Sequence, residues 1–249
     1  MASVFFAKDR SQIEVLNDRN TDTLNLLQQI RDSPDELAEY LRLTPYSRAQ
    51  HDEWADRWHS GWRPEDDITR AAVWFYILEV GYISGTNRKI SFSRSSNNSM
   101  SMFAKKYEKR VDRLDRLAER IRGVNLECLD YQEVIEKYDS EGTVYYCDPP
   151  YYDRQTDYGA ADFQHTDLRD TVVGLDSDIL ISYDDLPPCF VDLVEEEKDN
   201  WNVYERKTCQ TVSGNPKTVT ERLVANYDTG AKNRFTGQRQ RSLSQWTTG

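Results

Sequence analysis

The stretch TVYYCDPPYY, Thr143–Tyr152, decides how this chain is interpreted. Its first five residues form an apolar run rich in β-formers, which predicts a strand. Asp148-Pro149-Pro150-Tyr151 follows directly. In parallel α/β sheets, ligands bind beyond the carboxyl ends of the strands. We therefore expect this tetrapeptide to form a binding or catalytic loop, with a rigid turn between a strand and a helix as the structural alternative.

The chemistry of this loop suits methyl transfer to an amine. Two prolines fix φ and remove two N–H donors, so the loop is stiff and its carbonyls can accept hydrogen bonds. The Asp148 carboxylate and the Pro149 carbonyl can hold the two hydrogens of an exocyclic amine and stabilise the charge that develops on its nitrogen. Tyr151 can stack on the base, which must first be flipped out of a duplex.

The segments on either side predict an α/β sheet with a helical insertion between its halves. Further strands are predicted at residues 12–18, which end at Asp18, and at Asp178–Tyr183, which Asp184 follows. One helix is expected to begin at Ser33, as N-cap, with Pro34 in its first turn and Glu36 completing a capping box. Leu24, Leu27 and Ile30 recur at helical spacing and predict another helix. A closing pair of strands is expected at residues 203–212 and 219–227.

The insertion is predicted to be mainly helical. Ala71–Ile83 is apolar nearly all round and too short to span a bilayer, so it predicts a buried helix. Met100–Ile121 predicts one long helix, and Ser84–Asn98 a polar loop whose amides and arginines suit phosphates and base edges. Three tryptophans share one helical face, which favours core packing over base stacking: Trp54, Trp58 and Trp62.

The charge is unevenly spread. The chain has 43 acidic and 32 basic residues and a net charge of −11. Residues 88–122 hold 11 basic and four acidic residues, a net +7, so the remainder carries −18. Such an island is either an electrostatic footprint for nucleic acid or a helix face with many salt bridges. The acidic, lysine-poor remainder favours a halophilic protein over an ordinary acidic cytoplasmic one.

Several classes of protein are excluded. Four well-separated cysteines and three histidines without metal-ligand spacing argue against a disulfide framework and a zinc site. No apolar run approaches the ~20 residues of a membrane span, and no basic-apolar leader opens the chain. We therefore expect a soluble cytoplasmic protein without a metal or a membrane partner.

Over most of its length the sequence resembles the Dam-type DNA adenine-N6 methyltransferases. The resemblance implies S-adenosylmethionine as methyl donor, double-stranded DNA as substrate and a Rossmann-like sheet with a mainly helical DNA-recognition insertion. It implies a partial cofactor-binding half at 1–43, the insertion at 44–124, a catalytic half at 125–229 and a basic tail at 230–249. The segments that carry it are SVFFAKD (3–9), EVLNDRNTD (14–22), LTPYSR (43–48), LECLDYQEVI (126–135), YYCDPPYY (145–152), ILISYDDLP (179–187) and TERLVANYD (220–228).

The resemblance also implies roles for single residues. Asp18 would bind the ribose hydroxyls of the cofactor, in agreement with an acid at the end of a second strand. Asp130 would contact the adenine amino group of the cofactor and Tyr131 would flank its ring, with helix capping as the alternative for both aspartates. The catalytic loop would be Asp148, Pro149, Pro150 and Tyr151. Candidate DNA contacts are Arg88, Lys89, Arg94, Asn97 and Asn98.

One departure from the family is serious. A glycine-rich turn, Phe-x-Gly-x-Gly, normally precedes the segment that matches SVFF, where this sequence has Met1 and Ala2. The family's first strand, which pairs beside the TVYYC strand, is therefore expected to be missing, with weak or absent cofactor binding. An upstream start, a truncated gene or a strand from another chain would each account for it.

The sequence allows three alternative functions. The favoured one is a site-specific adenine methyltransferase, solitary or paired with a restriction endonuclease. The second is an inactive DNA-binding remnant, and the third is a methyltransferase acting on another planar amine.

Overall fold

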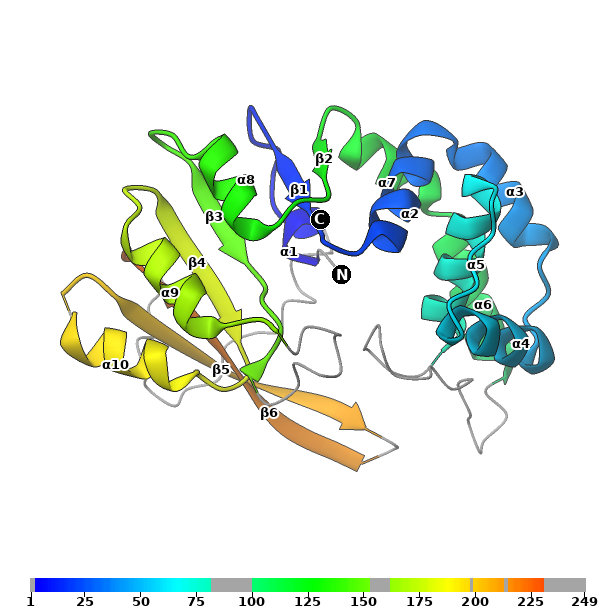
Figure 1. The fold of residues 1–249 in the computed structure, drawn as a ribbon. Helices are drawn as coiled ribbons and strands as arrows, with labels where there is room; N and C mark the ends of the chain where they lie inside the picture. The colour runs from blue at the N-terminus through cyan, green and yellow to red at the C-terminus, as the bar shows by residue number, and fades with distance from the viewer. Residues whose placement is uncertain (1–2, 82–99, 153–161, 198, 213–214, 231–249) are drawn as a thin grey trace. The chain divides into compact units, whose positions relative to one another are not determined.

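The computed structural model describes residues 3–81, 100–152, 162–197, 199–212 and 215–230, which form two compact units, Met1–Val134 and Ile135–Gly249. The architecture is mixed α/β (Figure 1). Unit 1 contains α1 (Ser3–Ala7), β1 (Val15–Asn17), α2 (Thr21–Asp32), α3 (Pro34–Leu43), α4 (Arg48–His59), α5 (Asp67–Val80), α6 (Met100–Val111), α7 (Leu114–Ile121) and β2 (Asn125–Glu127). Helix α8 (Tyr131–Tyr138) crosses the boundary.

Unit 2 carries the predicted strands. Its elements are β3 (Val144–Cys147), α9 (His165–Val173), β4 (Asp178–Tyr183), α10 (Pro188–Glu196), β5 (Asn202–Val212) and β6 (Asn215–Ala225). They form a sheet of order β3-β4-β6-β5, in which β3 and β4 are parallel and β6 is antiparallel to both of its neighbours. The predicted strand at Asp178–Tyr183 and the closing strand pair are confirmed.

The sheet of unit 1 consists of β1 and β2. The two strands are parallel, with Leu16 opposite Leu126 and Asn17 opposite Glu127. The strand expected over residues 12–18 is therefore present but shorter. In unit 2, β3 has a partner on one side only among the described residues, and 60% of Val144 and 40% of Tyr146 are exposed. The expected lack of the family's first strand beside β3 stays a prediction.

The core of unit 1 is built around α5. The helix is apolar on all sides, as predicted, and Ala71–Ile77 is buried throughout. The ring of Trp74 stacks on Trp58 of α4 with centroids 5.1 Å apart, which confirms core packing for Trp58. Trp62 was wrongly placed on the same helical face, because α4 ends at His59. Trp62 nevertheless packs against the core, as does Trp54, and the Arg57 guanidinium lies 3.6 Å from the Trp62 ring centroid.

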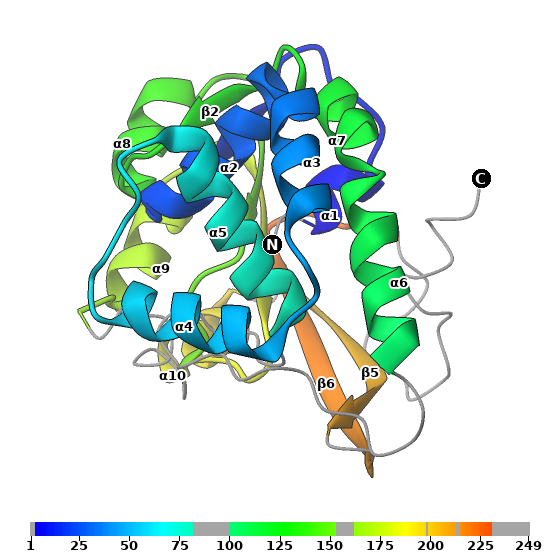
Figure 2. The same cartoon turned by 90° about the vertical axis from the view of Figure 1, so that its right-hand side faces the viewer.

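The prediction of one helix over Met100–Ile121 is wrong. Figure 2 shows α6 and α7 as two consecutive helices. The break falls at Asp112 and Arg113, where the Arg113 amide donates to the Arg110 carbonyl in a tighter turn. The turn changes the direction of the apolar face of the chain. Leu114 and the later apolar residues of α7 pack against α2 and α3, whereas α6 packs against α3 and α5.

The predicted capping box at Ser33 is also wrong in part. Helix α3 does begin there, with Pro34 in its first turn, but the Ser33 side chain makes no capping hydrogen bond. Ser33 also ends α2, since its amide donates to the Gln29 carbonyl at 2.9 Å. Its backbone, at φ −140° and ψ 48°, is not in the extended conformation of most N-caps.

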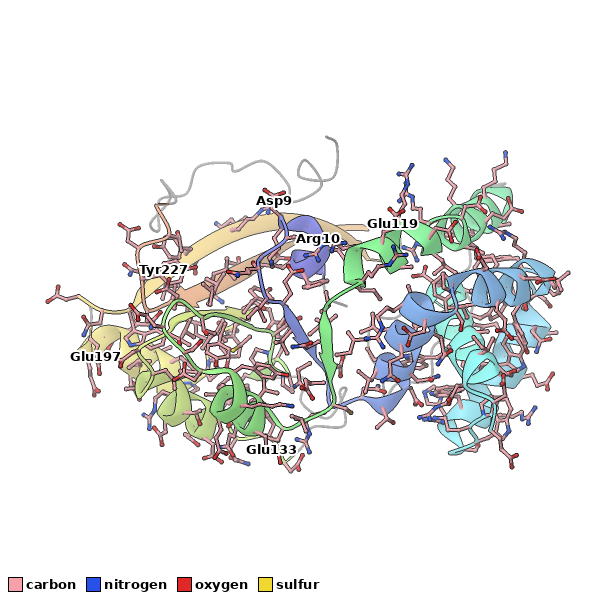
Figure 3. All side chains as sticks on the ribbon, turned by 90° about the horizontal axis from the view of Figure 1, so that it is seen from above. Asp9, Arg10, Glu119, Glu133, Glu197 and Tyr227 are labelled. Carbon is pink, nitrogen blue, oxygen red and sulfur yellow. The ribbon has the colours of Figure 1, made fainter. Side chains whose placement is uncertain are left out.

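Two buried carboxylates tie the elements of unit 1 together. Glu14, just before β1, accepts from both terminal nitrogens of Arg120 on α7, at 2.7 and 2.9 Å, and from Lys8 at 2.5 Å. Asp22 of α2 accepts from Arg63 and Arg70, each at 2.8 Å through Nε. Nearby, Arg10 donates to the Glu119 carbonyl at the end of α7 (Figure 3). These contacts fix the strand that carries Asp18.

No helix in the described parts of the chain has both the length and the apolar character needed to cross a membrane.

Candidate active site

The Asp148–Tyr151 loop leaves the carboxyl end of β3. The parallel register places Cys147 opposite Ile181 of β4, so Asp148 comes next to Ser182. The Ser182 hydroxyl donates to Asp148 Oδ1 at 3.0 Å. Asp148 is exposed, while both prolines and Tyr151 are half-buried. A fixed carboxylate therefore faces solvent at the edge of a rigid loop.

Tyr146 belongs to the same face of the sheet. Alternation along β3 places residues 144, 146 and 148 on one side. Although 40% of Tyr146 is exposed, desolvation of its hydroxyl raises its pKa, a hydrogen bond with Ser182 lowers the pKa, and the Asp148 charge adds a smaller rise. Tyr146, Ser182 and Asp148 thus form one hydrogen-bonded cluster. Sequence reasoning missed Tyr146 and Ser182, although Ser182 stands out as a hydroxyl residue directly after the apolar run Ile179–Ile181.

The Cys147 side chain lies on the opposite face of the sheet from Tyr146 and Asp148. Burial raises the pKa of its thiol to about 12, and the neighbouring Asp148 charge adds to the effect. The thiol is protonated at neutral pH and is therefore a poor nucleophile. The loop offers hydrogen-bond acceptors rather than a covalent nucleophile.

Asp18 and Asp130 lie at neighbouring strand ends in unit 1. The Asn17 side chain joins these ends, because its amide donates to the Leu129 carbonyl at 3.0 Å and its oxygen accepts from the Leu129 amide at 2.9 Å. Asp18 accepts from the Asn20 amide at 2.9 Å, but Asn20 is the N-cap of α2. The capping alternative for Asp18 is therefore wrong.

Asp130 does serve as a helix cap. Its Oδ1 accepts from the Gln132 amide at 3.1 Å, and its own amide donates to Glu133 at 3.0 Å (Glu133 is labelled in Figure 3). Its other oxygen lies 3.5 Å from an Arg19 terminal nitrogen. Tyr131 opens α8 and is half-buried. The capping role leaves 35% of the Asp130 side chain exposed, which is compatible with a ligand contact.

The five DNA-contact candidates, Arg88, Lys89, Arg94, Asn97 and Asn98, lie outside the described residues. Within the basic island, Arg110 pairs with Glu79 and Arg120 with Glu14, so part of its charge is used internally. Other basic residues of α6, of α7 and of the positions next to α7 are exposed: Lys105, Lys106, Lys109, Arg113, Arg116 and Arg122. The paired arginines thus support the interpretation as a helix face with salt bridges, and the exposed basic residues support the interpretation as a nucleic-acid footprint.

The described residues hold no group of three or more His, Cys, Asp or Glu side chains arranged to bind a metal ion.

Residues 2–183 match the family model of the D12 class N6 adenine-specific DNA methyltransferases. The matched range contains the Asp148–Tyr151 loop and Asp18, Asp130 and Tyr131, and it covers more than half of the chain. A search of curated proteins gave no match.

Proposed function

Because the chain belongs to the D12 class of N6 adenine-specific DNA methyltransferases, we propose that it methylates the N6 amine of an adenine flipped out of double-stranded DNA, with Asp148–Tyr151 as the catalytic loop. The observation that carries the proposal is the Ser182 hydrogen bond to Asp148 at the end of β3. It holds the carboxylate at the place where ligands of parallel sheets bind.

The loop acts on the amine through two acceptors. One Asp148 oxygen takes the Ser182 hydrogen, and the carboxylate presents a second oxygen to the amine. The Pro149 carbonyl accepts the other amine hydrogen. Together they localise the nitrogen lone pair and stabilise the developing positive charge. Tyr151 stacks on the flipped base and offsets part of the few kcal/mol that unstacking costs.

S-adenosylmethionine supplies the electrophilic methyl group when bound. Asp18 and Asp130 suit its adenosine part, because both follow the carboxyl ends of two paired parallel strands, and the Asn17 side chain joins these ends at Leu129. We assign Asp18 to the ribose hydroxyls, Asp130 to the adenine amino group and Tyr131 to the face of the adenine ring. The parallel pairs β1–β2 and β3–β4 are of the kind that a Rossmann-like sheet contains.

The helical segment at 44–124 is the proposed DNA-recognition insertion, between a cofactor half at 1–43 and a catalytic half at 125–229, with a tail at 230–249. Its exposed basic residues on α6 and α7 suit phosphates. The polar residues at Arg88, Lys89, Arg94, Asn97 and Asn98 suit base edges or phosphates.

The test is methylation of adenine-containing duplex DNA, read as N6-methyladenine by mass spectrometry. Asp148→Ala should lower the rate at least ~100-fold and leave DNA affinity within about twofold, since it removes an acceptor used in the transition state. Glu195→Gln, on α10, is the control. An Asp148→Ala variant with near wild-type activity would refute the catalytic assignment. A chain that binds DNA and yields no product would instead be an inactive remnant.

A further inference from the structure

Unit 2 contains a buried histidine that the methyl-transfer chemistry does not use. His165 begins α9 and only 5% of it is exposed. Its Nδ1 lies 3.0 Å from the hydroxyl oxygen of Tyr183, which is itself 1% exposed. A buried polar group without a partner is costly, so this hydrogen bond fixes the orientation of the imidazole ring.

The ring is surrounded by aromatic side chains. Its centroid lies 5.1 Å from that of Phe163 and 5.6 Å from those of Tyr152 and Tyr183. The Tyr152 ring meets the imidazole edge to face, at an interplanar angle of 64°. Tyr183 in turn contacts Phe190 of α10 at 5.5 Å. Tyr152 is 45% exposed, and edge-to-face rings pack with a defined geometry, so the buried ring of His165 supports the inner side of Tyr152.

Tyr152 directly follows the Asp148–Tyr151 loop. At the other end of that loop, Asp148 is held by Ser182. Ser182 and Tyr183 are consecutive residues of β4, so their side chains point to opposite faces of the sheet. One strand thus secures both ends of the loop, directly through Ser182 and indirectly through Tyr183 and His165.

We propose that His165 is a positioning residue for the catalytic loop: held by the Tyr183 hydroxyl, its buried imidazole fixes Tyr152 and thereby the Tyr151 end of the loop. The neutral ring suits this role. Its Nε2 is buried without a hydrogen-bond partner among the described residues, and burial lowers the pKa of the imidazole. A protonated ring would bury a charge and a second N–H donor.

The catalytic consequence rests on the proposed function. Misplacement of a reacting group by about 1 Å can cost up to ~100-fold in rate. Loss of the Tyr183–His165 hydrogen bond should therefore reduce kcat about 10-fold and change the KM for DNA less than about twofold. The loop position affects the transition state more than the initial binding of the duplex.

Three variants separate the two contacts of the imidazole. His165→Phe keeps a ring against Tyr152 and loses the hydrogen bond. Tyr183→Phe removes the hydroxyl partner alone and is the variant of choice if His165→Phe folds poorly. His165→Asn keeps a polar atom near the Nδ1 position and loses the ring. The control is Tyr204→Phe in β5, which also removes a buried tyrosine hydroxyl of unit 2, one that donates to Asp228 at 3.2 Å.

The decisive test is a double-mutant cycle. Each of His165→Phe and Tyr183→Phe should lower kcat about 10-fold, and the double variant should also lose about 10-fold rather than 100-fold, because both remove the same hydrogen bond. Tyr204→Phe should keep kcat within about twofold. Additive effects, or single variants with wild-type kcat, would overturn the proposal.

Hydrogen exchange tests the same inference without catalysis. The amides of Tyr151 and Tyr152 should exchange several-fold faster in His165→Phe and Tyr183→Phe than in wild type, while the amides of α5 in unit 1 keep their rates. Unchanged exchange at Tyr151 and Tyr152 would overturn the positioning role. If wild type transfers no methyl group, the proposed function fails, and the exchange data alone decide on His165.

Discussion

The most quantitative prediction concerns Glu14, the carboxylate that ties β1 to α7. The Arg120 guanidinium lowers the pKa of Glu14 from 4.5 to about 2, with help from Lys8 and the Ser11 amide and against the effect of burial. The Glu14 side chain is 7% exposed, so solvent screens these contacts little. A difference of about 2.5 pKa units corresponds to roughly 3 kcal/mol of stability for the ionised form at pH 7.

The sign of the pH dependence follows from the lowered pKa. A carboxyl group with a depressed pKa stabilises the fold above its unfolded-state pKa and loses this effect as the pH falls through the folded-state value. Glu14→Gln should therefore be less stable than wild type by roughly 3 kcal/mol at pH 7, roughly 2.5 at pH 4 and about 1.5 at pH 3.

The assay is urea unfolding followed by tryptophan fluorescence, since Trp54, Trp58, Trp62 and Trp74 all belong to unit 1 with Glu14. Glu39→Gln, an exposed position on α3, is the matched control and should change stability by less than about 0.5 kcal/mol. A cost below about 1 kcal/mol for Glu14→Gln at pH 7, or a cost that does not shrink with acid, would contradict the assigned Glu14–Arg120 stabilisation.

Two further substitutions test other contacts. Ser182→Ala removes the donor to Asp148 and should lower kcat about 10-fold in single-turnover methylation, corresponding to about 1.4 kcal/mol, with DNA affinity unchanged; an unaltered rate would show that the loop holds the carboxylate unaided. Asp22→Asn leaves two arginines of unit 1 without their buried carboxylate and should cost about 3 kcal/mol in urea unfolding. Asp112→Asn, which breaks an exposed pair with Arg42, should cost less than about 1 kcal/mol, and equal costs would contradict the burial argument.

Much of the secondary structure was predictable, because it depends on neighbouring residues. The apolar run at Val144–Cys147 and the helical spacing in α2 each specify an element locally. The break between α6 and α7 was not predictable in this way. The apolar stripe continues through Val111 and Leu114, and only the packing of the two helices on different neighbours requires the turn.

The candidate site also contains residues that can be predicted from the sequence and residues that cannot. Asp18 is identifiable from its place at the end of a predicted strand, and Asp130 from the family resemblance, but Asn17, which joins the two strand ends, is not. The amide of Asn17 reaches Leu129, 112 positions later in the chain. A local pattern holds no signal for such a contact.

The Asp-Pro-Pro-Tyr loop follows from local sequence, since two prolines restrict the backbone wherever they occur and the preceding apolar run forms a strand. The contacts that hold this loop depend on folding. Ser182 reaches Asp148 from 34 positions away, and Tyr183 reaches His165 from 18. Ser182 and Asp148 meet because β3 and β4 pair in one parallel register, and His165 meets Tyr183 because α9 packs beside β4. Register and helix packing are properties of the folded unit rather than of any one segment.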